Sequence, residues 1–177
     1  MSLSKAISRR LGGSVAGLLL LGLSLAGCGF QPLYGAHTIH TDADLAGIRV
    51  DPIHERAGQL LEIALRDGFN PENIGVEARS VLVVILGESV GDFAIRSDGT
   101  TSRQIYNLTA AFKLTDLKTH KLLLEGHSRS NNSYDVAENE YSVVVARDSA
   151  EKRAVRQLSD DIRARVAMFF RQKQTGS

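Results

Sequence analysis

The strictest pattern in this chain is an alternation of side chains between residues 106 and 115. Tyr106, Leu108, Ala110, Phe112 and Leu114 alternate with Asn107, Thr109, Ala111, Lys113 and Thr115. Because successive side chains of a strand point to opposite faces of a sheet, this period of two predicts a strand with one buried and one wetted face. The fold therefore needs a layer that covers one side of a sheet.

Three other segments have strand character. Residues 48–51 alternate apolar with charged side chains before a proline, and residues 121 to about 130 carry three leucines near their start. Residues 80–86 are rich in valine, leucine and isoleucine, and the pattern resumes at 90–95 after Gly87, where we expect a bulge or bend. Polar stretches at 96–103 and 116–120 predict short links between the last three strands, which favours an antiparallel meander.

Two segments have helical spacing of their apolar residues. Residues 55–67 carry such a stripe and are followed by Gly68, a typical helix stop. A longer helix is predicted from near Ser142, with Ala150, Leu158 and Ile162 on one stripe and charges elsewhere. The prediction is an α+β fold: a four-stranded, mainly antiparallel sheet with two helices packed on one face, in the order β-α-β-β-β-α.

The N-terminal segment has the organisation of a secretory signal. Lys5, Arg9 and Arg10 precede an apolar run at 11–25 that ends in a pair of small residues before Cys28, the only cysteine. A transmembrane helix is the alternative, but the run is shorter than the roughly 20 residues of a span and is diluted by glycine and serine. We expect residues 1–27 to be a signal peptide.

The ending Leu25-Ala26-Gly27-Cys28 resembles the lipobox of bacterial lipoproteins. The resemblance implies that Cys28 carries acyl chains such as palmitate and becomes the mature N-terminus, which would hold the protein on a membrane. Gly29 is not the aspartate that marks inner-membrane retention in enteric lipoproteins, so the outer membrane is favoured. We expect a lipidated tether at 28–46, one globular domain at 47–171 and a frayed tail at 172–177.

Composition excludes several classes of protein. Three of the 21 basic residues but none of the 20 acidic ones lie in the signal, so the mature chain is slightly acidic and nothing indicates a nucleic-acid partner. No second long apolar segment follows, which excludes a polytopic membrane protein. With Cys28 committed to lipid, the fold has to be stable without disulfides.

No pattern in the chain indicates catalysis. The five histidines lack metal-ligand spacing, and a cation site formed by His37, His40, Asp42 and Asp44 is less favoured than a solvated tether. Nucleophile-elbow, P-loop and dinucleotide motifs are missing. The paired carboxylates Asp160 and Asp161 lie on a charged helix face. We therefore expect no enzyme, no metal and no cofactor.

Basic residues gather near the second and third predicted links. They are Arg96, Arg103, Lys113, Lys118 and Lys121. Guanidinium and ammonium groups at this density can bind phosphate or carboxylate groups, although each residue taken singly is more often an ordinary solvated charge.

The mature N-terminus Cys28-Gly29-Phe30-Gln31-Pro32-Leu33-Tyr34-Gly35 looks like that of alphaproteobacterial lipopolysaccharide-assembly lipoproteins, the LptE family. Arg129-Ser130-Asn131-Asn132-Ser133-Tyr134-Asp135-Val136 and Leu158-Ser159-Asp160-Asp161-Ile162-Arg163 are similar to that family's strand-to-helix passage. The resemblance implies an outer-membrane lipoprotein that plugs a large β-barrel partner and helps to insert lipopolysaccharide into the outer leaflet. It also makes the five basic residues candidates for lipopolysaccharide binding.

Two other functions have the same sequence features. One is an accessory lipoprotein of a different outer-membrane assembly complex, which only the identity of the partner would separate. The other is a lipid-anchored cell-wall hydrolase, which activity on peptidoglycan would reveal.

Overall fold

The fold is described by a computed structural model over residues 39–73, 75–95 and 101–175. All of these residues belong to one compact unit that begins at Thr38. The elements in chain order are α2 (Ile39–Ala46), β1 (Ile48–Val50), α3 (Arg56–Phe69), β2 (Ser80–Ile95), β3 (Thr101–Asp116), β4 (Leu122–Asp135) and α4 (Glu140–Thr175).

The four strands form one mixed sheet in the order β1-β2-β3-β4. β1 pairs in parallel with only the first three residues of β2, from Ile48 opposite Ser80 to Val50 opposite Leu82. A parallel pair needs a crossover connection, and α3 supplies it. The other strands form the predicted antiparallel meander. The α+β fold with a mainly antiparallel sheet is thus confirmed.

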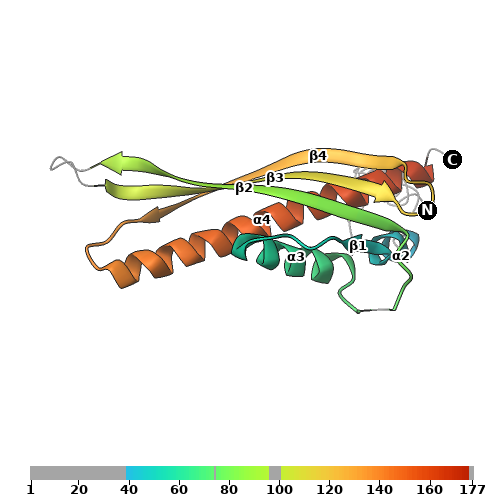
Figure 1. The fold of residues 1–177 in the computed structure, drawn as a ribbon, viewed down its shortest axis with the longest axis horizontal. Helices are drawn as coiled ribbons and strands as arrows, with labels where there is room; N and C mark the ends of the chain where they lie inside the picture. Colours follow the sequence, from blue (N-terminus) through green and yellow to red (C-terminus); the bar gives the residue numbers. More distant parts are fainter. Residues whose placement is uncertain (1–38, 74, 96–100, 176–177) are drawn as a thin grey trace, which may run out of the picture. The chain divides into compact units, whose positions relative to one another are not determined.

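Both long helices lie on the same side of the sheet (Figure 1). The core between the layers is made by side chains from α3, α4 and the inward positions of the strands. Its largest fully buried members are Tyr106, Phe112, Leu61, Leu65, Leu82, Leu108, Leu114, Leu158, Ile162 and Val166. The period-two stripe of β3 therefore forms the centre of the core, as its sequence predicts.

The irregularity of β2 lies elsewhere than expected. Gly87 is paired in register with Thr109, and the register shifts occur between Asp92 and Ile95. A Cβ atom on Gly87 would lie 2.9 Å from the Thr109 hydroxyl oxygen. The glycine thus makes room for a cross-strand side chain, and the prediction of a bulge there is wrong.

Strand β4 is longer than its apolar content indicates. It continues to Asp135 because its later inward positions are polar and bind α4 through side chains. Asn132 Nδ2 donates to Gln157 Oε1 at 3.1 Å, and Arg153 Nε donates to Asn132 Oδ1 at 3.4 Å. Ser130 also donates to Gln157. Hydrogen bonds satisfy these buried polar groups, so the strand tolerates an inward face without apolar side chains.

The ends of the domain are more helical than expected. Part of the predicted tether, Ile39–Ala46, is the helix α2, and α4 continues past Arg171 into the predicted frayed tail. These two ends meet, since Gln174 Nε2 donates to Asp44 Oδ2 at 3.4 Å, and Leu45 is buried. Residues 28–38, including Cys28, lie outside the described residues.

None of the helices within the described residues is long and apolar enough to cross a membrane.

The contact between α4 and the sheet gives the first prediction. Leu158→Ala removes a fully buried side chain and leaves a cavity, so we expect a loss of about 3 kcal/mol of unfolding free energy. Ile63→Ala on the exposed side of α3 is the control and should change it by less than about 0.5 kcal/mol. Urea denaturation measures both, and equal values would contradict this core assignment.

Candidate functional site: the uncovered face of the sheet

The sheet has a second face, which neither α3 nor α4 covers (Figure 1). It is formed by the odd-numbered residues of β2, β3 and β4, because the even-numbered ones point into the core. We call it the uncovered face. From the register its central members are Val83, Ile85, Gly87, Ser89, Asn107, Thr109, Ala111, Lys113, Glu125, His127, Arg129 and Asn131.

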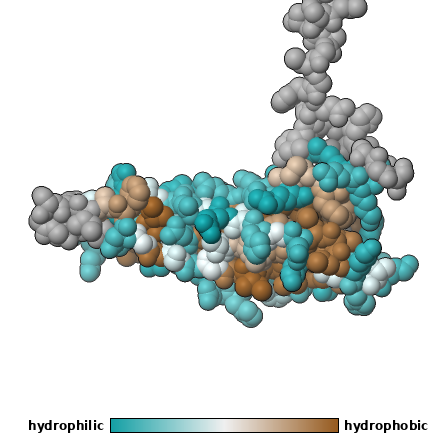
Figure 2. All heavy atoms as spheres, turned by 90° about the horizontal axis from the view of Figure 1, so that it is seen from above, coloured by the Kyte–Doolittle hydropathy of each residue, from teal (hydrophilic) through white to brown (hydrophobic). Residues whose placement is uncertain are grey.

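On the uncovered face, charges of both signs lie on β3 and β4, and exposed apolar side chains lie on the first half of β2. Lys113 lies opposite Glu125, and Arg103 is opposite Asp135 with its Nε 2.9 Å from a carboxylate oxygen. Ile85 is 70% exposed among them. Figure 2, a view onto this side, shows hydrophilic and hydrophobic side chains intermixed. Such a surface suits a wet, polar contact better than a continuous apolar interface.

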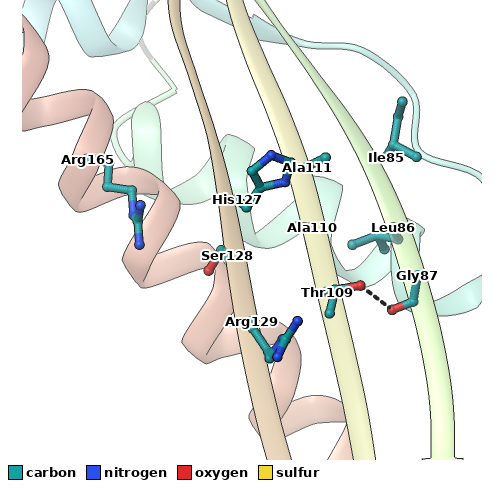
Figure 3. A pocket seen from close by; sticks show the side chains of 10 residues that line it. All are labelled: Ile85, Leu86, Gly87, Thr109, Ala110, Ala111, His127, Ser128, Arg129 and Arg165. Carbon is teal, nitrogen blue, oxygen red and sulfur yellow. Dashed lines mark hydrogen bonds between the residues drawn. The ribbon is translucent and has the colours of Figure 1, made fainter.

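A concavity of about 740 Å³ lies where small residues of neighbouring strands adjoin. Gly87, Thr109 and Ala111 line it, and the Thr109 hydroxyl donates to the Gly87 carbonyl oxygen at 3.1 Å. His127 and Arg129 of β4 also line it (Figure 3). The sequence analysis missed these two residues, because only the pairing of strands places them across β3 from the glycine.

Arg165 of α4 is a further lining residue of the concavity, and a carboxylate orients it. Its Nε lies 3.1 Å and 3.0 Å from the two carboxylate oxygens of Asp161. Burial disfavours the charged form of Asp161, but hydrogen bonds from Ser128 and Arg165 outweigh it and lower the pKa of this carboxyl. Arg129, Arg165 and His127 together offer donors suited to an anionic group.

The basic residues predicted as a patch are divided along the sheet. Lys118 and Lys121 are exposed in the turn after β3, which Asp116 orders by accepting bonds from the Lys118 and Thr119 amides at 3.0 and 2.7 Å. The Thr119 bonds lower the pKa of Asp116. Lys113 lies on β3 close to this turn.

Arg103 lies far from those lysines. Ten residues of strand β3 separate it from Lys113, a distance of about 34 Å. Arg96 lies outside the described residues. The structure therefore brings Lys113, Lys118 and Lys121 to one end of the sheet and places Arg103 near the other.

Metal-ligand side chains do not gather in the described part of the chain. Its histidine, cysteine, aspartate and glutamate residues form no group of three or more that could hold a metal ion. Asp161, one of the paired carboxylates, binds Arg165.

Comparison with known proteins identifies the family of this chain. A family model described as "LptE: Lipopolysaccharide-assembly" matches residues 45–166, which include β1 to β4 and most of α4. The chain belongs to the LptE family. Membership implies a role in lipopolysaccharide assembly, and the family is in general non-enzymatic and located at the outer membrane.

Relatives of this LptE-family chain agree with its fold. An uncharacterized protein of Rickettsia prowazekii, RP188, is 24% identical over 156 residues, covering 88% of this chain and 97% of that protein. The crystal structure of a putative lipoprotein from Caulobacter crescentus has a TM-score of 0.64 and 22% identity, covering 76% of this chain and 97% of that one. A minor lipoprotein from Acinetobacter baumannii has a TM-score of 0.51 and 14% identity, covering 68% and 90%.

The lowered pKa of Asp161 predicts a pH dependence. The charged carboxylate contributes stability above its ordinary pKa of about 4, and this contribution is lost as the pH falls through the lowered value. Asp161→Asn should therefore be less stable than the native chain at pH 6, with the difference narrowing at pH 3. Urea midpoints at both values measure it, and a constant difference would contradict the assignment.

Proposed function

We propose that this LptE-family protein is an outer-membrane lipoprotein, anchored by acyl chains on Cys28, that plugs the lumen of the lipopolysaccharide-assembly β-barrel. It supports assembly of that barrel and helps to insert lipopolysaccharide into the outer leaflet as a subunit of the translocon. The observation that carries this proposal is the family match over residues 45–166, and the lipobox before Cys28 adds to it.

The uncovered face supports docking inside a barrel. Residues facing the lumen of a large outer-membrane barrel are polar, so a plug needs a surface of mixed polarity that contributes hydrogen bonds and ion pairs. The pairing of Lys113 with Glu125 across strands, and the charged side chains of β3 and β4 beside the apolar ones of β2, meet this requirement. The near-neutral charge of the chain without residues 1–27, with 18 basic against 20 acidic residues, also avoids strong repulsion from either sign of lining.

Lipopolysaccharide is the proposed ligand, because it presents phosphates that lysine and arginine bind with charge-assisted hydrogen bonds. Arg96, Arg103, Lys113, Lys118 and Lys121 are the proposed contacts. The three lysines at one end of the sheet form the compact part of this set, and the concavity with Arg129 and Arg165 offers a second group of cations.

Alanine substitution tests the ligand. Changing all five residues to alanine should weaken lipopolysaccharide binding by tenfold or more, because each lost phosphate contact costs on the order of 1 kcal/mol. Changing only the three lysines should retain most of that effect if they act as a group. The control is Arg66→Ala with Arg156→Ala, two exposed residues on the helical side. Binding undiminished in the five-residue variant would refute the assignment.

Charge reversal tests the docking face. Lys113→Glu with Arg129→Glu places two carboxylates on the uncovered face, beside Glu125 in the first case. We expect the tagged variant to recover several-fold less barrel protein from outer membranes than the native chain. Arg66→Glu with Arg156→Glu is the matched control. Equal recovery by all three chains would show that this face does not contact the barrel.

The same purification separates the other functions. A different assembly complex bound to the native chain would indicate an accessory lipoprotein of that complex. A bound cell-wall fragment, or release of peptides from peptidoglycan, would indicate a hydrolase.

A further inference from the structure

Strand β2 has a long edge without a partner strand. The strand spans Ser80–Ile95, but β1 pairs with only its first three residues. Beyond Leu82, no other strand within the described residues pairs with β2 on that side. An unpaired edge leaves a row of backbone donors and acceptors that can template another strand.

The hydrogen-bonding direction of this edge follows from two contacts. The Asp51 amide donates to the Leu82 carbonyl oxygen at 3.0 Å, and the Ser80 amide donates to the Gly47 carbonyl oxygen at 3.3 Å, so the backbone groups of even-numbered residues point to the β1 side. In a strand, the N–H and C=O groups of one residue point to the same edge, and those of the next residue point to the opposite edge. Val84, Leu86, Glu88 and Val90 therefore direct their N–H and C=O groups to the open edge.

Exposed apolar side chains accompany this edge. Val83, Ile85, Val90 and Phe93 are all exposed on β2, whereas the other outer strand, β4, exposes only Leu122 among its described large apolar residues. Natural edge strands are commonly protected by charge or proline. β4 carries Glu125 and Arg129, whereas on β2 the charged Glu88 and Asp92 are accompanied by these exposed apolar side chains.

The helical layer leaves a space beside the same edge. On α4, Asp148 and Glu151 contact Arg56 at the start of α3, and Arg147 Nη2 donates to Glu88 Oε1 at 3.0 Å. Val144 lies one helical turn earlier on the same side, beyond the start of α3, and is 65% exposed. Tyr141 precedes it by a further turn and is also exposed.

We propose that the open edge of β2, at residues 84–90, pairs with an extended segment of the barrel partner, which adds as a strand in line with β1. This inference rests on the proposed function and names the region of the plug that binds. Strands of a closed barrel have no free edges, so the segment is a loop that enters the lumen. Its inward side chains pack against Val90 and Val144.

Charge favours a partner segment over a second copy of this chain. Symmetric antiparallel pairing of two β2 edges around Ser89 would place Asp92 opposite Leu86 of the other copy and diagonal to its Glu88, which is repulsive although Arg147 offsets part of the charge of Glu88. Asp92 adds a further carboxylate on the same side. Gln104 Nε2 donates to its Oδ1 at 3.0 Å, and no ion pair joins it to a cation among the described residues. The complementary segment is therefore apolar with a basic residue near Asp92.

Hydrogen exchange resolved to single amides tests the proposal on the native chain. In the purified full-length protein, the amides of Leu86, Glu88 and Val90 should exchange quickly, and in the complex with the coexpressed barrel at least tenfold more slowly. The control amides are Arg129 and Asn131, which point to the free edge of β4. Equal protection of both edges would reflect general burial and would overturn strand addition, as would no protection of β2.

A proline pair gives a second test. Val90→Pro removes an edge N–H without breaking a bond to β3, and Asn131→Pro does the same at the edge of β4. We expect Val90→Pro to reduce barrel recovery at least fivefold relative to Asn131→Pro. If Val90→Pro does not fold, as judged by circular dichroism, the exchange measurement on the native chain decides.

The outcomes of these experiments distinguish a failure of this inference from a failure of the proposed function on which it rests. If the native chain recovers no barrel, both fail. If it recovers the barrel but Val90→Pro behaves like Asn131→Pro, only the edge assignment fails. Protection of β2 that appears in the isolated protein and disappears on dilution would assign the edge to a second copy and overturn the proposal.

Discussion

The packing of α4 against one face of the sheet is the constraint on which the rest of the structure depends. Its stripe of alanine, leucine, isoleucine and valine meets the alternate side chains of β3, and residues such as Ala150, Leu158 and Ile162 are fully buried there. Small alanines let the helix approach closely, while the larger residues fill the space between strands. Because one long helix spans the length of the strands, a single layer suffices to form the core.

This one-sided arrangement determines which surfaces are available. The uncovered face presents a wetted mixture of charges and apolar groups. The short β1 leaves the far part of β2 without a partner strand on its outer side, within the residues described. These surfaces are broad and suited to contact with another macromolecule. The same geometry that stabilises the domain therefore provides its proposed binding surfaces.

Much of the fold was predictable because its main elements have strong periodicity. Residues 106–115 and the stripe of α4 carry unambiguous apolar patterns, and their packing on one another follows from amphipathicity. The helix α2 was not predictable, since the burial of Leu45 depends on the distant end of α4. The polar end of β4 was missed because Asn132 is satisfied by Gln157, a contact that no local pattern reveals.

The candidate site was less accessible to sequence analysis. The basic residues were grouped by their closeness along the chain, but a strand of sixteen residues carries its two ends far apart, which separates Arg103 from the lysines. Arg129 and Arg165 adjoin the same concavity although they are remote in sequence. Strand register and helix placement create this juxtaposition, and neither can be inferred from the spacing of the residues along the sequence.

The most direct test of the account is purification of the lipidated, tagged protein from its native host in mild detergent, followed by mass spectrometry of what remains bound. The account predicts a large outer-membrane β-barrel with a periplasmic lipopolysaccharide-transport domain, recovered in equal amount with the tagged chain. Recovery of the protein alone, or of another assembly complex, would contradict the plug function while leaving the fold unchanged.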